Sequence, residues 1–227
     1  MKEIRLFDYQ QEMLENITEV FSAAVFDSVL YNEKRKRVNV GSSVMVQMPT
    51  GTGKTYVMAA VVKWFLDTYS KGEVWLIAHR KELVEQMERT LDRFVLEYGE
   101  KNEELEEKVR IRVLSIQWLT RNIGDLEKNG FRPGLIIVDE AHHSLATSYQ
   151  DVFIRNHKAL KIGMTATPCR MKQASFGTLF SRLITSPSTR DLIMRGYLAS
   201  YNYGVIGMKS TDRKIINQLE DNASDGD

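Results

Sequence analysis

The stretch PTGTGKT at residues 49–55 carries the residue types that bind the phosphates of a nucleotide. Its two glycines let backbone amides point into one concavity, its lysine can reach the outer phosphates, and its final threonine can ligate Mg²⁺. The general phosphate-loop pattern has glycine at position 48, where this chain has Met48. A glycine-rich turn without a ligand is the alternative interpretation. We predict that the nucleotide is held by Thr50, Gly51, Thr52, Gly53, Lys54 and Thr55.

Two adjacent carboxylates, Asp139 and Glu140, follow the apolar run GLIIV. Asp139 can hold Mg²⁺ through its water shell, and Glu140 can orient and polarise the water that attacks a phosphate. An isolated Asp-Glu pair is more often a surface turn, but this one follows a run typical of a buried strand. His142 and His143 lie beside the pair, yet no HExxH spacing is present and adjacent histidines diverge, so zinc is not expected. We predict catalytic roles for Glu140, Lys54 and Asp139, with Thr55 and Asp139 as magnesium ligands.

Short apolar runs alternate with longer helical patterns along the chain, and these elements must position the two motifs. This rhythm predicts an α/β fold with a mostly parallel sheet, covered by helices on both faces in three layers. Functional loops are then expected at the carboxyl ends of the strands. The basic run at 34–37 is expected to be a solvated loop. Strands are expected at 43–48, 73–78, 110–115, 134–140 and 159–165, and helices after Tyr9, at 54–69 and at 81–97.

Composition is that of a soluble globular protein and does not identify a partner. The 227 residues are 43% hydrophobic, and 31 basic residues balance 30 acidic ones, so any contact with nucleic acid must rest on a local patch. The single cysteine, Cys169, excludes an internal disulfide framework, and no signal peptide or membrane span is recognisable. These features predict a cytoplasmic protein without membrane contact. One domain is expected over 1–207, followed by a flexible linker over 208–227.

Three motifs in order give the chain a resemblance to a known group of proteins. MPTGTGKT at 48–55, DEAH at 139–142 and GMTATP at 163–168 resemble motifs I, II and III of superfamily 2 helicases and translocases, in their first RecA-like domain. LFDYQQEML at 6–14 resembles the Q motif, and IAHRKELVEQ at 77–86 resembles motif Ia. The pattern is most similar to the motor subunits of type I and type III restriction enzymes. The resemblance implies a RecA-like P-loop NTPase fold of the DEAD/DEAH-box kind, with ATP and Mg²⁺ as cofactors.

The resemblance also implies roles for residues outside the two motifs. Gln10 would read adenine, because its amide offers one donor and one acceptor. Phe7 either stacks on the adenine or belongs to the core, and both interpretations stay open. A surface basic pair is the alternative for the two motif Ia residues, and Trp118 is expected in the core. Contacts to the nucleic-acid backbone are assigned to His79, Arg80, Ser115 and Gln117, and coupling of hydrolysis to movement to His142, Thr165 and Thr167.

Members of this superfamily hydrolyse ATP between two RecA-like domains, and the second domain supplies arginine fingers. We expect this chain to hold only the first domain, to bind nucleotide, and to hydrolyse it weakly by itself. The implied partners are DNA or RNA, the second RecA-like domain, and nuclease, methyltransferase or specificity subunits. A P-loop kinase is one alternative; it would need an acceptor pocket and an arginine-rich lid, and no such lid is recognisable before the tail. A non-catalytic nucleotide switch is the other, although the complete set of phosphate-loop and acidic residues argues against it.

Overall fold

The computed structural model describes residues 5–22, 28–31, 37–69, 72–79, 85, 110–141, 147–166 and 179–200. Side chains are described throughout these ranges except in 28–31 and 37–41. The helix predicted at 81–97 lies outside this part of the chain apart from residue 85, and the linker predicted at 208–227 lies outside it entirely. No helix within the described ranges is long and apolar enough to cross a membrane.

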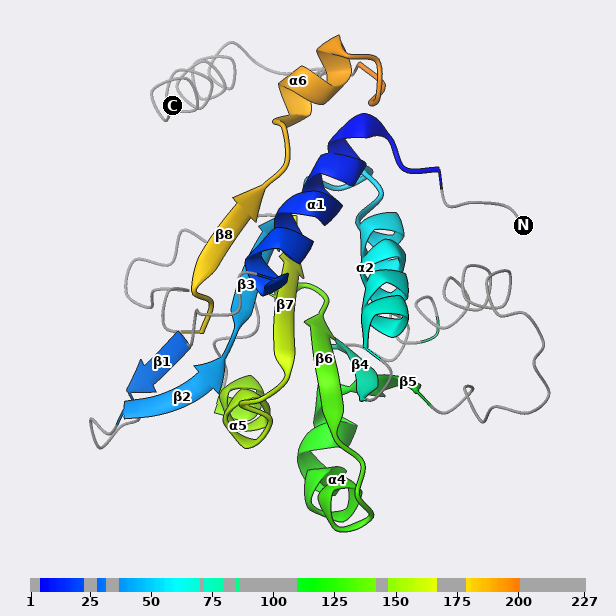
Figure 1. Ribbon diagram of the computed structural model, residues 1–227. Coiled ribbons are helices and arrows are strands. Elements are labelled where there is room, and N and C mark those ends of the chain that lie inside the picture. Colours follow the sequence, from blue (N-terminus) through cyan, green and yellow to red (C-terminus); the bar gives the residue numbers. More distant parts are fainter. Residues whose placement is uncertain are drawn as a thin grey trace, which may run out of the picture.

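Six strands form one central sheet in the order β5-β4-β6-β7-β3-β8 (Figure 1). Every pairing in this sheet is parallel, so the carboxyl ends of all six strands lie at the same edge. The predicted α/β fold class is therefore confirmed, and each predicted strand is present with ends shifted by at most two residues. The strands are β3 (Ser43–Gln47), β4 (Glu73–Ala78), β5 (Ile111–Ser115), β6 (Pro133–Val138), β7 (Leu160–Thr165) and β8 (Arg182–Thr185).

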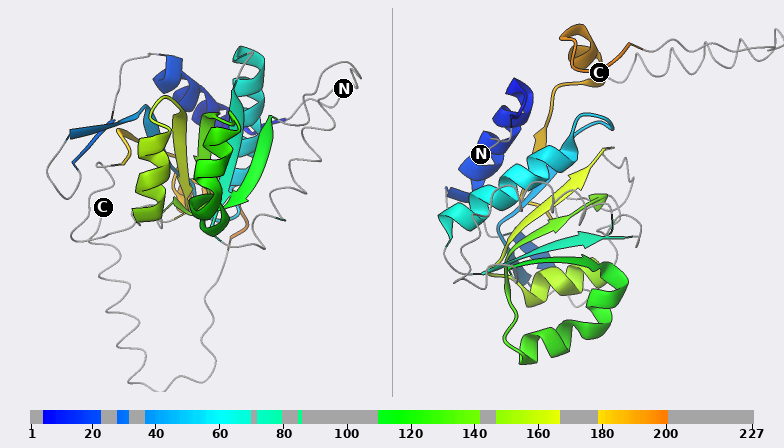
Figure 2. Two further views of the ribbon diagram at one scale, coloured as in Figure 1. Left: turned by 90° about the horizontal axis from the view of Figure 1, so that it is seen from below. Right: turned by 90° about the vertical axis from the view of Figure 1, so that its right-hand side faces the viewer.

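Helices cover both faces of the sheet and give the three predicted layers (Figure 2). The helices α1 (Asp8–Ser22) and α2 (Lys54–Thr68) pack on one face. The opposite face carries α4 (Ile116–Lys128) and α5 (Thr147–Arg155). A short helix, α6 (Thr189–Met194), lies beyond the carboxyl end of β8 (Figure 1).

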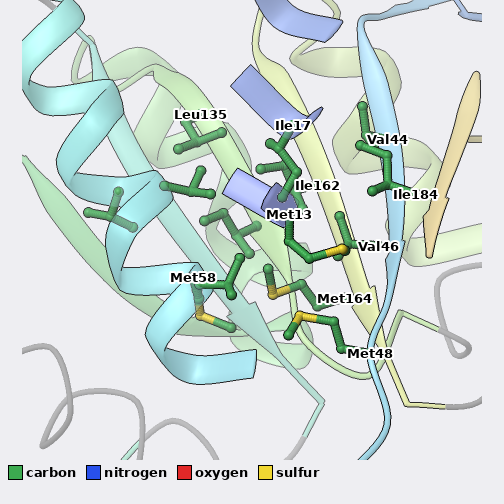
Figure 3. Packing of buried hydrophobic residues seen from close by; sticks show 14 of the residues in the cluster. Met13, Ile17, Val44, Val46, Met48, Met58, Leu135, Ile162, Met164 and Ile184 are labelled. Atoms are coloured by element: carbon green, nitrogen blue, oxygen red, sulfur yellow. The ribbon is translucent and has the colours of Figure 1, made fainter. Parts of the chain in front are cut away.

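The apolar runs in the strands divide their side chains between two cores. In β4, Val74, Leu76 and Ala78 belong to the core under α1 and α2, whereas Trp75 and Ile77 belong to the core under α4 and α5. All five are fully buried, which is why the strand is apolar from Val74 to Ala78 and does not alternate with polar residues there. Figure 3 shows the first core, where side chains of α1 and α2 lie against β3, β6 and β7.

The structure differs from the sequence predictions in several elements. The prediction of a loop at 34–37 is wrong at Arg37, which begins β2 (Arg37–Gly41) and pairs with β1 (Ser28–Tyr31) in a separate antiparallel sheet. The rest of the basic run lies outside the described residues. No sequence prediction anticipates α4, α5, α6 or β8. The buried face of α4 is nevertheless readable in the spacing of its apolar residues, Ile116, Leu119, Ile123 and Leu126.

Candidate nucleotide site and nucleic-acid face

The predicted phosphate loop connects the carboxyl end of β3 to α2 and turns at two glycines. Gly51 (φ 83°) and Gly53 (φ 77°) lie in the left-handed region that favours glycine. The backbone N–H groups of Tyr56 and Val57 donate to the Gly53 carbonyl at 2.9 and 3.3 Å, so α2 starts directly at the loop. The amino-terminal end of a helix, where backbone N–H groups lack helical partners, therefore borders the place predicted for phosphates.

Hydrogen bonds within the chain fix the shape of this loop. Thr52 Oγ1 donates to the Pro49 carbonyl at 2.7 Å, and the Met48 N–H donates to the Thr165 carbonyl at 2.9 Å. Lys54 Nζ donates to the Met48 carbonyl at 3.4 Å. The Met48 side chain is fully buried in the core shown in Figure 3. The residue that departs from the general glycine pattern therefore contributes to packing.

Gln10, the predicted adenine reader, is hydrogen-bonded to the phosphate loop. Its Nε2 donates to the Thr52 carbonyl at 2.9 Å, and the Tyr9 hydroxyl donates to the same carbonyl at 2.8 Å. Gln10 Oε1 accepts the backbone N–H of Phe7 at 3.0 Å. A Cβ atom added to Gly53 would overlap the Gln10 amide, which is a second reason for glycine there. The buried Gln10 side chain thus positions the loop, and its contact with adenine stays a prediction.

An aromatic cluster of Phe7, Tyr9 and Tyr197 lies beside the loop. Phe7 is 54% exposed, so the alternative that places it in the core is wrong. Its ring centroid lies 6.1 Å from that of Tyr9 and 5.1 Å from that of Tyr197, and the two tyrosine rings are 5.0 Å apart. The Tyr197 N–H donates to the Leu192 carbonyl of α6 at 2.8 Å. No local pattern reveals Tyr197, because the contact joins the two ends of the described chain.

Asp139 and Glu140 lie at the same edge of the sheet as the phosphate loop. They follow β6, which is separated from β3 only by β7, and all three strands are parallel. Two strand spacings of about 4.8 Å place the carboxyl ends of β3 and β6 about 10 Å apart. The Asp139 N–H donates to the Ile77 carbonyl of β4 at 3.0 Å, which anchors the pair to the sheet. The fold therefore brings the two motifs to one edge.

Glu140 holds a backbone conformation that residues with a side chain rarely adopt. Its φ is 50°, and among the described residues it is the only one other than glycine with a positive φ. Its N–H donates to Oδ1 of Asp139 at 2.9 Å, which fixes one oxygen of that carboxylate. Such conformations cost free energy and concentrate at functional sites. The strain at Glu140 is a feature that no sequence pattern predicts.

The predicted magnesium ligands suit the chemistry of the ion. Mg²⁺ prefers oxygen ligands and is usually held by one or two side chains together with substrate phosphates and water. Asp139 offers a half-buried carboxylate, and Thr55 offers a hydroxyl in the first turn of α2. The described residues contain no group of three or more His, Cys, Asp or Glu side chains that could hold a metal ion. A site completed by nucleotide phosphates therefore fits the residues present.

Three of the predicted nucleic-acid contacts lie where β4 and β5 end. Gln117 Nε2 donates to the His79 carbonyl at 2.9 Å, which joins the start of α4 to the end of β4. Ser115 caps α4, because its hydroxyl oxygen accepts the N–H of Trp118 at 3.3 Å. Trp118 is 45% exposed, so its predicted place in the core is wrong. Arg80 lies outside the described residues.

A pocket of about 450 Å³ opens between the end of β4 and the first turns of α4 and α5. Its most buried polar residue is Tyr149, which is 1% exposed. Burial raises the pKa of Tyr149 to about 12, and the negative charge of Asp139 adds to the rise. Six wall residues belong to α4 and α5, the helices that the sequence analysis does not predict. The pocket is lined by His79, Ile116, Gln117, Thr120, Arg121, Ser148 and Tyr149.

Only one of the predicted coupling residues belongs to the described part of the chain. Thr165 ends β7, the strand between β6 and β3, and it is 1% exposed. It therefore lies between the acidic pair and the phosphate loop in the order of the sheet. His142 and Thr167 lie outside the described residues.

The chain matches a protein family described as "Type III restriction enzyme, res subunit" over residues 3–170. A "51.5 kDa protein" of a Lactococcus phage (isolate 7-9) is 31% identical over 159 residues, which cover 70% of this chain and 32% of the phage protein. The "Putative ATP-dependent helicase IRC3" of Saccharomyces cerevisiae is 27% identical over 234 residues, which cover 98% of this chain and 31% of the yeast protein. This chain therefore spans about a third of the length of these two relatives.

A solved structure with a similar fold is the "ATP-dependent Type ISP restriction-modification enzyme LlaBIII bound to DNA". The two structures superpose with a TM-score of 0.60 at 19% sequence identity. The similarity covers 87% of this chain and 16% of the larger one. At this level of identity, the similarity supports the fold alone.

Proposed function

Because the chain belongs to the family of the res subunit of type III restriction enzymes, within superfamily 2 of the helicases and translocases, we propose that it is a nucleotide-hydrolysing motor domain. It would bind ATP with Mg²⁺ and hydrolyse it to move along, or unwind, DNA or RNA. The observation that carries this proposal is the position of the phosphate loop and the acidic pair at one edge of a parallel sheet, two strands apart.

Each residue of the nucleotide site has a distinct task in this proposal. The loop amides and Lys54 bind the phosphates. To reach them, the Lys54 amine gives up its hydrogen bond to the Met48 carbonyl, which is 3.4 Å long. Thr55 and Asp139 would hold Mg²⁺, which would supply positive charge beside the phosphates. Glu140 accepts a hydrogen bond from the attacking water and orients it toward the outermost phosphate.

The base would lie beside the aromatic cluster. The exposed ring of Phe7 offers a stacking surface. The Gln10 side chain accepts the Phe7 N–H at 3.0 Å, and its Nε2 donates to the Thr52 carbonyl at 2.9 Å and to the Tyr9 hydroxyl at 3.4 Å. Gln10 Oε1 keeps a second lone pair for adenine, whereas donation to adenine requires Nε2 to exchange one of its two bonds for the base. Preference for ATP over other nucleotides therefore depends on how readily that bond is exchanged.

Nucleic acid would run across the ends of β4 and β5. We assign backbone contacts to His79, Arg80, Ser115 and Gln117. We assign the coupling of hydrolysis to movement to His142, Thr165 and Thr167, since Thr165 lies between the two catalytic segments in the sheet. The Ser115 hydroxyl accepts the Trp118 N–H, so its own proton is available for a phosphate oxygen.

Full activity would require parts of the protein beyond this chain, which spans about a third of its relatives. A second RecA-like domain would supply arginine fingers, so we expect slow hydrolysis by this chain alone. Nuclease, methyltransferase or specificity subunits are the proposed partners of the complete assembly. We propose a cytoplasmic location because a single cysteine suits a reducing compartment.

Calorimetric titration of this chain with ATP and Mg²⁺ tests the nucleotide site. We expect saturable binding, weakened about 10- to 100-fold by Lys54→Ala, which is the range for a lost hydrogen bond to a charged group. Lys63→Ala is the matched control, because Lys63 lies on the same helix and pairs with Asp67 at the surface. No heat on titration of the unaltered chain, or equal losses in the two variants, would contradict the proposal.

The Glu140→Gln variant, made in a protein that also carries the second RecA-like domain, distinguishes a motor from a nucleotide switch and from a P-loop kinase. A motor should retain ATP binding and lose turnover. A nucleotide switch should show unchanged turnover in that variant, and a P-loop kinase should transfer phosphate to a small acceptor without any stimulation by nucleic acid.

A further inference from the structure

The chain that follows α6 turns back toward the start of α1 (Figure 1). The Tyr197 N–H donates to the Leu192 carbonyl at 2.8 Å, and the Gly196 N–H donates to the Ile193 carbonyl at 3.0 Å. This pair of bonds, with Gly196 at a φ of 77°, is the Schellman ending of a helix. Because Leu192 is fully buried in the core under α1 and α2, the turn fixes the backbone of Tyr197 relative to that core.

The side chains of this turn reach both parts of the proposed nucleotide site. The ring centroid of Tyr197 lies 5.1 Å from that of Phe7 and 5.0 Å from that of Tyr9. The next residue, Leu198, lies beside the phosphate loop, since a Cβ atom added to Gly51 would be 3.8 Å from its Cδ2 atom. The turn therefore borders the loop on one side and the aromatic cluster on the other.

The ring of Phe7 depends on its neighbours for a fixed orientation. Its backbone is held because its carbonyl accepts the N–H groups of Gln10 and Gln11, each at 2.9 Å, but these bonds leave the side chain free to change rotamer. The ring of Tyr9 lies nearly parallel to that of Phe7, at 14° and 6.1 Å. The ring of Tyr197 is closer, at 5.1 Å, and is tilted by 56°. These two contacts order an aromatic ring whose side chain is still 54% exposed.

We propose that Tyr197 is a positioning residue for the nucleotide base, because it holds the Phe7 ring in the orientation in which the base stacks on it. This inference rests on the proposed function, in which Phe7 supplies the stacking surface. A side chain that is ordered before the ligand arrives removes its ordering cost from the free energy of binding. Removal of the Tyr197 ring should therefore weaken binding of the base and leave binding of the phosphates unchanged.

Calorimetric titration of this chain with ATP and with inorganic tripolyphosphate, both with Mg²⁺, tests the role of Tyr197. We expect Tyr197→Leu to weaken ATP binding about three-fold, within the range for ordering one side chain, and to leave tripolyphosphate binding unchanged. Tyr197→Phe retains the ring and should bind ATP as the unaltered chain does. Both changes keep the bonds of the turn, which are made by backbone groups.

A double-mutant cycle shows whether Tyr197 acts through Phe7. In a chain that already carries Phe7→Ala, Tyr197→Leu should have no further effect on ATP affinity, because no ring is left to position. Tyr69→Leu is the matched control, since the Tyr69 ring also has two aromatic neighbours, Phe65 at 4.8 Å and Trp64 at 5.9 Å. Tyr69 follows the last residue of α2, at the opposite end from the phosphate loop, so its variant should keep full ATP affinity.

Several results would overturn the positioning role. These are unchanged ATP affinity in Tyr197→Leu, equal weakening of ATP and tripolyphosphate, weakened ATP binding in Tyr197→Phe, and additive effects in the cycle. Circular dichroism checks that each variant is folded, and Tyr197→Met, which keeps more side-chain length, gives the same comparison if the leucine variant is not. Failure of the unaltered chain to bind ATP would instead contradict the proposed function itself.

Discussion

Two buried side chains donate to one acceptor, and replacing both should destabilise the protein by more than the sum of the single replacements. The Thr52 carbonyl accepts Tyr9 Oη at 2.8 Å and Gln10 Nε2 at 2.9 Å. Tyr9→Phe and Gln10→Met remove these donors while largely keeping side-chain shape. After either single change one donor remains, but the double variant leaves the carbonyl bare in a residue that is 1% exposed.

The size of the interaction energy follows from a difference in cost: a buried group left with no hydrogen bond loses more free energy than one that loses one of its two bonds. Tyr9→Phe should lower the free energy of unfolding by about 0.5–1.5 kcal/mol. Gln10→Met should lower it by about 1–3 kcal/mol, because the Phe7 N–H also loses its acceptor. The double variant adds the desolvation penalty of the Thr52 carbonyl, so the interaction energy in the cycle should be about 1–3 kcal/mol.

Urea unfolding of the four proteins at one pH measures this interaction energy. The matched cycle replaces Gln10→Met by Gln11→Met, because Gln11 is the next residue of α1 and its side chain bonds only to exposed Glu15 in the described structure. That second cycle should be additive within about 0.5 kcal/mol. Additivity of the Tyr9 and Gln10 changes to the same precision would refute the shared-acceptor explanation.

Phe7→Ala should weaken ATP binding about two- to ten-fold and leave inorganic tripolyphosphate binding unchanged, because only the base loses a stacking partner; equal weakening in calorimetric titrations would contradict this. Glu140→Gly should raise the free energy of unfolding by about 1 kcal/mol, because glycine adopts a φ of 50° without strain. A lower urea midpoint for that variant would show that the side chain contributes more than the strain. Because the folded-state pKa of Tyr149 is raised from 10.0 to about 12, its contribution to stability should be complete below pH 10 and lost as pH rises toward 12. Alkaline unfolding should therefore be less steep in Tyr149→Phe, and parallel curves for the two proteins would disprove this.

The parts of the fold that sequence predicts are those set by short-range patterns. Val74 to Ala78 read as a strand because every residue is apolar, and the phosphate loop is recognisable because glycines, lysine and threonine are contiguous. The α4 helix has equally regular apolar spacing, so its buried face is also readable from the sequence.

The features that sequence does not predict depend on distant partners. Whether Phe7 and Trp118 are exposed is decided by what packs beside them, and both contradict a place in the core. The contact of Phe7 with Tyr197 joins residues at opposite ends of the described chain. The backbone angle of Glu140 is imposed by the turn that follows β6, and glutamate itself has no preference for it.

The order of the sheet also has a consequence for how the protein is made. The strand β3, which leads into the phosphate loop, is the first of the six to leave the ribosome, but its neighbours β7 and β8 are the last two. Until they emerge, both edges of β3 lack their hydrogen-bonding partners, which is the condition in which strands mispair or aggregate. Synthesis therefore exposes the phosphate-binding segment while β4, β5 and β6 are made, and the segment becomes protected only when β7 and β8 join the sheet.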